Sequence, residues 1–213
     1  MGSIFCIVGK SSSGKDTIYK RLLRNPALKL ERIILYTTRP IREGEREGVE
    51  YYFTTVEMLE QFRREHKIIE CRSYDTVYGP WHYFMAKDSQ IDLTRHSYLV
   101  IGTLESYLNT RNYFGADRVV PIYIDLDDGE RLSRALKRER RQAEPKYEEM
   151  CRRYIADNRD FSQEKLERAG ITTSFDNQDL NTCLEEIAAY ILSCQRVEQQ
   201  SAVREYVTVK QRI

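Results

Sequence analysis

Glycine and lysine residues near the N-terminus are spaced to hold phosphate groups. Gly9, Gly14 and Lys15 fill a G-x-x-x-x-G-K pattern in GKSSSGKDT, directly after the short apolar run Ile4–Val8. Glycine allows a tight turn whose backbone N–H groups point at phosphate oxygens, lysine adds positive charge, and a helix starting here adds its dipole. Because the loop joins an expected strand to an expected helix, the pattern predicts a nucleotide-phosphate site. Its residues are Gly9, Lys10, Ser11, Ser12, Ser13, Gly14, Lys15, Asp16 and Thr17.

Asp16 stands where such loops usually carry a hydroxyl residue that binds magnesium. A carboxylate is also a hard oxygen ligand, so one interpretation is that Asp16 ligates Mg²⁺ directly or through water. Thr17 does not replace it, because one step along a helix rotates a side chain by roughly 100°. Two alternatives stay open: Asp16 only favours the first turn of a helix, or the loop is degraded and binds phosphate poorly.

A second polar cluster occupies Thr37–Phe53, TTRPIREGEREGVEYYF. Arg39 and Arg42 suit a dianionic phosphate because a guanidinium group bonds two oxygens at once, and Tyr51 adds a neutral donor. Taken alone, the segment could equally be a solvated charged loop.

The composition narrows the class of protein. A chain of 213 residues, 41% hydrophobic, fits one globular domain with inserted subdomains. Its 34 basic and 33 acidic residues give a net charge of +1, which provides no overall basic field for nucleic acid. The five cysteines are scattered and no apolar run reaches the ~20 residues of a membrane span. We expect a cytoplasmic protein, a monomer or homodimer, that binds small-molecule nucleotides rather than nucleic acid or membrane.

Apolar runs alternate with helical patterns, which predicts an α/β protein with a mainly parallel sheet. Strands are expected at Ile4–Val8, Arg32–Thr38, Lys67–Tyr74, Tyr98–Ile101, Val119–Ile124 and Ile171–Phe175. Helices are expected after the phosphate loop until Pro26, and at Val56–Arg64, Asp128–Arg141, Lys146–Phe161 and Leu180–Ile191. One apolar helix face is expected from Tyr147, Met150, Cys151, Tyr154 and Ile155. From Gln195 the chain becomes a polar tail with partial strand character at 204–209.

The polar cluster also matches the pattern TTR-x-x-R-x-GE-x-x-G-x-x-Y-x-F, and in this the chain resembles the guanylate kinase family, which transfers the terminal phosphate of ATP to GMP. The pattern is filled by Thr37, Thr38, Arg39, Arg42, Gly44, Glu45, Gly48, Tyr51 and Phe53. The resemblance runs from about Ile4 to Ile191 and implies a P-loop nucleoside monophosphate kinase fold, a parallel sheet flanked by helices. It divides a domain at 1–194 into a core (1–34, 91–127 and 166–194), an acceptor-binding insertion (about 35–90) and a lid (about 128–165). Residues 195–213 form the tail.

The resemblance also implies roles for individual residues. The acceptor GMP or dGMP would be held by Arg39, Arg42, Glu45, Tyr51, Glu70 and Tyr78, with Glu70 reading the guanine edge. Transfer would depend on Lys15, Arg42, Arg138 (or its neighbours Arg134, Arg140 and Arg141) and Arg153. Asn177 would lie near the adenine of ATP, and Mg²⁺ would accompany the ATP.

Three departures from the family pattern affect the acceptor site. Ile101 and Thr103 stand where the family has the aspartates of a D-x-D, Leu35 replaces a serine that helps read guanine, and Pro80 replaces a small hydroxyl residue. Glu70 is then the main guanine reader, with Glu105 or Asp125 as candidates for the lost acidic role. Two alternatives to a GMP kinase therefore stay open: an inactive phosphopeptide-binding module, and a kinase for another small phosphorylated acceptor.

Overall fold

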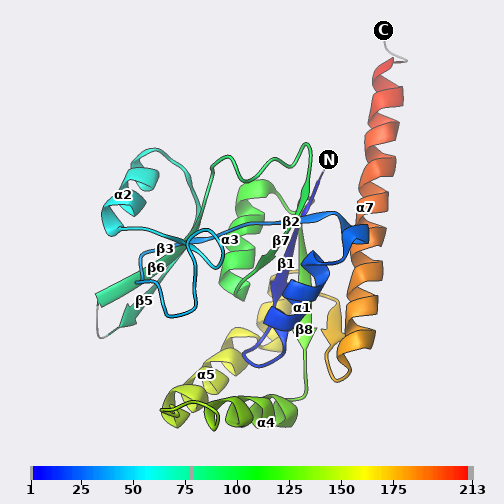
Figure 1. Ribbon diagram of the computed structural model, residues 1–213. Helices are drawn as coiled ribbons and strands as arrows, with labels where there is room; N and C mark the ends of the chain where they lie inside the picture. The colour runs from blue at the N-terminus through cyan, green and yellow to red at the C-terminus, as the bar shows by residue number, and fades with distance from the viewer. Residues whose placement is uncertain (1, 77–78, 211–213) are drawn as a thin grey trace.

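The core of the molecule is a five-stranded parallel sheet with the strand order β2-β7-β1-β8-β9. Figure 1 shows the computed structural model, which describes residues 2–76 and 79–210, and the side chains among these up to residue 197. The strands are β1 (Ile4–Val8), β2 (Leu30–Arg32), β7 (Ser97–Ile101), β8 (Val119–Asp125) and β9 (Ser174–Asp176). The predicted α/β class, with a parallel sheet flanked by helices, is confirmed.

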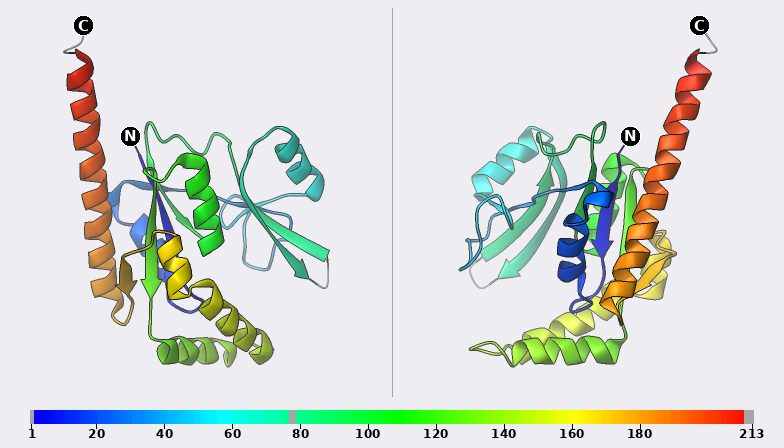
Figure 2. Two further views of the ribbon diagram at one scale, coloured as in Figure 1. Left: turned by 180° about the vertical axis from the view of Figure 1, so that it is seen from behind. Right: turned by 45° about the vertical axis from the view of Figure 1, so that its right-hand side comes forward.

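Helices cover both faces of this sheet because β1 is apolar on both sides. Phe5 and Ile7 pack with α1 (Lys15–Leu23) and α7 (Leu180–Lys210), whereas the alternate β1 residues pack with α3 (Leu104–Phe114) and α6 (Gln163–Arg168). The view from behind and the view turned by 45° both show α7 running along one side of the sheet and projecting beyond it (Figure 2). A short 3₁₀ turn, η1 (Pro26–Leu28), links α1 to β2.

A second, four-stranded sheet carries the polar cluster and stands beside the core (Figure 1). Its order is β4-β3-β6-β5, with bounds β4 (Tyr52–Phe53), β3 (Tyr36–Thr37), β6 (Gly79–Ala86) and β5 (Ile68–Thr76). One face is covered by α2 (Val56–Arg64), whose Leu59 packs with Phe84. Strands β5 and β6 pair antiparallel, and Arg72 lies opposite Tyr83. Cross-strand partners share a face, so Arg72 and Tyr83 lie on the face that α2 does not cover.

Two charged helices, α4 (Asp128–Glu139) and α5 (Tyr147–Asp160), follow β8 and lie below the carboxyl ends of the core strands (Figure 1). The apolar face predicted for α5 is only partly covered, and no residue of the helix is fully buried. Met150 and Tyr154 are half-buried against the phosphate loop and α4, whereas Tyr147, Cys151 and Ile155 are exposed.

Two strand predictions need correction. The predicted strand Arg32–Thr38 is two strands in different sheets, and between them Ile34 bonds the side chain of Gln90 through both its N–H and its C=O. The segment thus crosses from one sheet to the other. The predicted strand Ile171–Phe175 begins only at Ser174.

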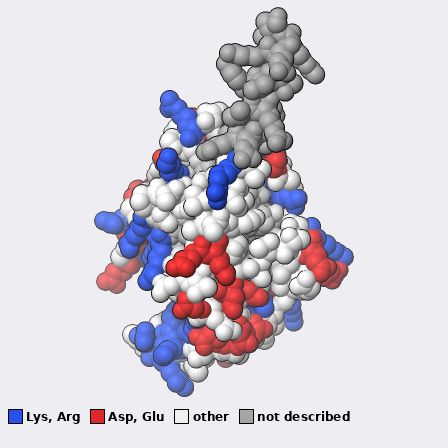
Figure 3. Space-filling model, turned by 90° about the vertical axis from the view of Figure 1, so that its right-hand side faces the viewer, with Lys and Arg blue, Asp and Glu red and all other residues white. Residues whose placement is uncertain are grey.

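Other elements were not predicted. Strand β6 and helix α3 were left unassigned, and α7 continues as helix to Lys210 through the region given partial strand character. The face seen in Figure 3 carries both charge signs, with acidic side chains gathered in its middle and lower part. No described helix has the length and apolar character needed to cross a lipid bilayer.

Candidate active site

The phosphate loop is formed by the six residues between β1 and α1. Gly14 caps α1 in a left-handed conformation with φ 93°, and a Cβ placed there would meet Asn177 Nδ2 at 2.3 Å. A Cβ at Gly9 would meet the carbonyl oxygen of Ile124 at 2.5 Å. Both glycines of the pattern are therefore required by close packing, and at Gly14 also by backbone conformation. Ser12 also adopts a left-handed conformation, with φ 63°, although it is not a glycine.

Lys15 lies at the start of α1 and folds back on the loop, donating from Nζ to the carbonyl oxygen of Lys10 at 2.8 Å. Burial lowers the pKa of Lys15, while the neighbouring charge of Asp16 opposes this shift. Asp16 and Thr17 are exposed in the first turn of the helix. Lys15 therefore lies against the inner side of the loop, and the carboxylate of Asp16 lies at its solvent-exposed edge.

Asn177, directly after β9, supports the loop. It is buried, and its Nδ2 donates to the carbonyl oxygen of Ser13 at 2.7 Å. Its Oδ1 is buried without a hydrogen-bond partner among the described residues. Asn177 thus lies at the nucleotide loop, and its predicted contact with adenine stays a prediction.

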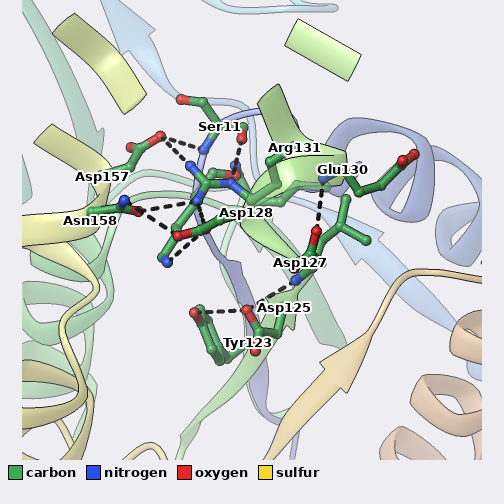
Figure 4. Close-up of polar contacts among 12 residues, drawn as sticks. Ser11, Tyr123, Asp125, Asp127, Asp128, Glu130, Arg131, Asp157 and Asn158 are labelled. Atoms are coloured by element: carbon green, nitrogen blue, oxygen red, sulfur yellow. Dashed lines mark hydrogen bonds and ion pairs between the residues drawn. The ribbon is translucent and has the colours of Figure 1, made fainter. Parts of the chain in front are cut away.

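An ion network around the buried Arg131 ties the loop to α4 and α5 (Figure 4). Arg131 is 1% exposed, donates from Nε to the carbonyl oxygen of Ser11 at 3.2 Å, and pairs with Asp128. Asp128 also accepts from Lys10 Nζ at 3.2 Å. Asp157 Oδ2 accepts a 2.7 Å hydrogen bond from the backbone N–H of Ser11.

Sequence reasoning missed Arg131 and Asp157. Both lie in helices whose charge density is typical of solvated surface. The i, i+3 spacing of Asp128 and Arg131 was the available signal.

The arginines predicted for the lid lie at the same loop. Arg138 and Arg153 line a cavity of about 10 Å³ together with Ser11 and Ser12. This is room for about one water molecule between the loop and the helices α4 and α5. Both arginines are more than half exposed, and Arg153 bonds Glu149 at 2.7 Å. Of the neighbouring arginines, Arg134 donates to the carbonyl oxygen of Asn177 at 3.2 Å. Arg140 and Arg141 are exposed.

The acceptor arginines differ in their surroundings. Arg39 is 3% exposed, donates to both carboxylate oxygens of Glu45 at 2.7 and 2.5 Å, and lies over the rings of Tyr51 and Phe53. The bond to Arg39 holds the pKa of Glu45 below its usual range, and Glu45 also accepts from the backbone N–H of Arg42 at 2.9 Å. Glu45 therefore holds together the loop at residues 39–45. The Arg42 side chain itself is exposed.

Tyr83 lies among the predicted acceptor residues, and sequence reasoning missed it. Its ring lies 5.6 Å from that of Tyr51 and 5.7 Å from that of Tyr74, and its hydroxyl interacts with Arg39. The predicted acceptor tyrosine, Tyr78, lies outside the described residues. The alternation of β6, which was not recognised as a strand, was the signal that would have placed Tyr83 on the cluster's face.

Glu70 lies on the same face but is already paired. Its side chain is 1% exposed, and Arg72 donates to both of its carboxylate oxygens, at 3.1 and 3.3 Å. Burial raises the pKa of Glu70, and the charge of Arg72 opposes this rise. Leu35, at the position of the family's serine, is buried in the core. Thr103, at the position of a family aspartate, caps α3 with its side chain. Glu105 is exposed in the first turn of α3.

Asp16 is the residue predicted to hold magnesium. The described residues contain no group of three or more His, Cys, Asp or Glu side chains placed to hold a metal. Asp16 is the hard oxygen donor at the open edge of the loop, so it fits a metal whose other ligands come from nucleotide phosphates and water.

Known proteins resemble this chain in sequence and in structure. The guanylate kinase family model matches residues 1–194. The guanylate kinase of Mycoplasmoides gallisepticum is 43% identical over 79 residues, which are 37% of this chain and 40% of that protein. That of Listeria monocytogenes is 36% identical over 73 residues, 34% and 36% of the two chains. These matches therefore span about two fifths or less of the relatives' length.

The fold is shared as well. The crystal structure of guanylate kinase from Anaplasma phagocytophilum matches with a TM-score of 0.61 and 21% identity over 90% of this chain and 85% of that one. The family model and the formed phosphate loop lead to one conclusion: the chain belongs to the guanylate kinase family.

Proposed function

We propose that the protein is an ATP-dependent nucleoside monophosphate kinase that transfers the γ-phosphate of ATP to GMP or dGMP, giving ADP and GDP or dGDP. The observation that carries this is the formed phosphate loop, with Gly14 and Lys15 in place, in a chain whose family match extends from the loop through the acceptor segment. A phosphopeptide-binding module has no need of that loop. The cytoplasmic location and the monomeric or dimeric state stay predictions.

Phosphoryl transfer requires alignment and positive charge more than covalent chemistry from the protein. Lys15 would contact the transferred phosphate, and Arg138 and Arg153 would close on it from the lid. Arg42 would reach the acceptor phosphate, because its side chain is exposed, unlike that of Arg39. Tyr51 and Tyr83 would complete the acceptor-phosphate site beside Arg39, whose pairing with Glu45 positions it.

Magnesium would be held by Asp16 together with the phosphates of ATP. Bound Mg²⁺ would neutralise charge on the β- and γ-phosphates. Asp16→Ala is expected to weaken the binding of Mg²⁺ to the enzyme–ADP complex, measured by calorimetry, about tenfold or more. Unchanged Mg²⁺ affinity would assign Asp16 to the helix alone. Thr17→Ala, one residue along the same exposed turn, is the matched control.

The test of the function is a coupled assay of ADP release with a panel of monophosphates: GMP, dGMP, AMP, CMP and UMP. Turnover with GMP or dGMP, abolished in Lys15→Ala, is the expected result. Turnover only with another monophosphate would replace the acceptor. A folded protein that turns over none of them, yet binds a phosphopeptide, would identify the binding module instead.

A further inference from the structure

Arg72 shares the uncovered face of the second sheet with Glu70, two residues earlier on β5. Its Nε donates to Glu70 Oε2 at 3.1 Å and its Nη2 to Oε1 at 3.3 Å. The side chains are 9% and 1% exposed, so the pair is held away from water. Burial strengthens this contact and makes separation of the two charges costly.

The shape of this pair matters for reading a base. Two adjacent N–H groups of one guanidinium meet the two oxygens of one carboxylate, a side-by-side arrangement. Guanine presents an equivalent pair of adjacent donors, the ring N1–H and the 2-amino group. Arg72 therefore occupies the face of the Glu70 carboxylate that a guanine would use for both donors.

Arg72 also connects the second sheet to the core. Its Nη1 donates to Oγ1 of Thr103 at 3.4 Å, at the start of α3. Of the five guanidinium N–H groups, three donate in these bonds within the described part of the chain, which leaves two. The positive charge of Arg72 also acts on Tyr51, and Tyr74 acts on Arg72, so the guanidinium lies beside the aromatic acceptor site. Its remaining donors can meet a carbonyl oxygen.

We propose that Arg72 is a specificity-determining residue of the acceptor pocket, which it tunes to 6-oxopurine monophosphates with or without a 2-amino group. The C6 carbonyl oxygen accepts from Arg72, and Glu70 accepts a single donor, the N1–H. Arg72 bonds both oxygens of Glu70, so the carboxylate takes this one further donor on a remaining lone pair. The 2-amino group of guanine then adds little, because the side-by-side contact that it would need is occupied by Arg72. The inference rests on the proposed kinase function and names the feature of the base that the pocket reads.

The experiment compares GMP with inosine monophosphate, which is GMP without the 2-amino group. We expect the wild-type protein to phosphorylate both, with kcat/KM values within about tenfold of each other. Arg72→Ala frees both oxygens of Glu70 and is expected to raise the GMP-to-IMP ratio by about tenfold or more, because a charged hydrogen bond is then gained by GMP alone. Arg72→Lys keeps the charge but cannot make the side-by-side contact, so it should raise the ratio in the same direction.

The matched control is Arg63→Ala. Arg63 approaches Cys71 from the opposite face of β5 and should leave the ratio unchanged. Calorimetric titration of GMP and IMP into each variant gives the same comparison without turnover.

Wild-type preference for GMP above about 100-fold, unchanged by either substitution, would overturn the inference while leaving a GMP kinase intact. The wild-type ratio decides this even if Arg72→Ala does not fold. Absence of turnover with every 6-oxopurine would instead overturn the proposed function.

Discussion

The backbone N–H of Ser11 in the phosphate loop donates a 2.7 Å hydrogen bond to the carboxylate of Asp157 on α5. Helix α5 thereby places an internal anion on a backbone donor of the phosphate loop. Asp157 also lies 3.6 Å from Arg131 Nη2, so its charge is partly balanced in this position. On the proposed function, a nucleotide phosphate would compete with Asp157 for the Ser11 N–H.

Asp157→Ala is expected to tighten ATP binding about three- to tenfold, because it removes a competing anion and a repulsive charge. Isothermal titration of ATP into the purified protein measures this. Asp160→Ala is the control, since Asp160 is an exposed residue at the end of α5 that pairs with Lys165 of α6. Equal affinities of Asp157→Ala and wild type would show that the contact does not compete with ATP.

The pH dependence should reflect Lys15. Burial lowers its pKa below the ordinary 10.5, and only the protonated form is positively charged. As pH rises through this lowered pKa, Lys15 loses its charge, and kcat/KM for ATP should fall at a lower pH than an exposed lysine would give. Lys15→Arg should remove this alkaline limb from whatever activity it retains, because arginine stays protonated. An alkaline limb of equal position in Lys15→Arg would assign it to another group.

Removal of the buried guanidinium of Arg131 should destabilise the fold. Arg131 bonds Ser11 and Asn158 and lies 4.9 Å from the ring of Tyr154, so Arg131→Ala loses polar contacts and packing. We expect the free energy of unfolding, from urea denaturation, to drop by about 2 kcal/mol. Arg152→Ala, in an exposed pair with Glu149, should change it by less than about 0.5 kcal/mol. Similar effects of the two substitutions would contradict the structural role of Arg131.

Exposed cysteines should react with alkylating reagents faster than buried ones. Burial raises the pKa of Cys6 to about 12 and that of Cys183 to about 11, whereas Cys151 is exposed on α5. Because the thiolate is the reactive form, iodoacetamide at neutral pH should modify Cys151 first in the folded protein. Peptide mass spectrometry before and after urea denaturation measures this. Modification of Cys6 in the folded protein at the rate of Cys151 would show that β1 is not buried.

Several features could be read from the sequence because they depend on local patterns. The all-apolar run Ile4–Val8 had to be a central strand, and the glycines of the phosphate loop marked its turn into α1. The helix predicted at Val56–Arg64 has those bounds in the structure. The arginine–glutamate–tyrosine pattern of the second sheet was sufficient to suggest the family, and residues 1–194 match its model.

Pairing across the chain was decided only by tertiary structure. The pattern of 32–38 is continuous in sequence, yet its two ends join different sheets, because partner strands lie on either side. No sequence pattern marked Arg72 or Asp157, and only folding brings them to Glu70 and to Ser11. Residue types set which groups can bind phosphate, but a hydrogen bond depends on distances of about 3 Å between atoms far apart in sequence. The sequence therefore determined the phosphate loop and the family, while the packed chain decided which charges reach the loop and the acceptor pocket.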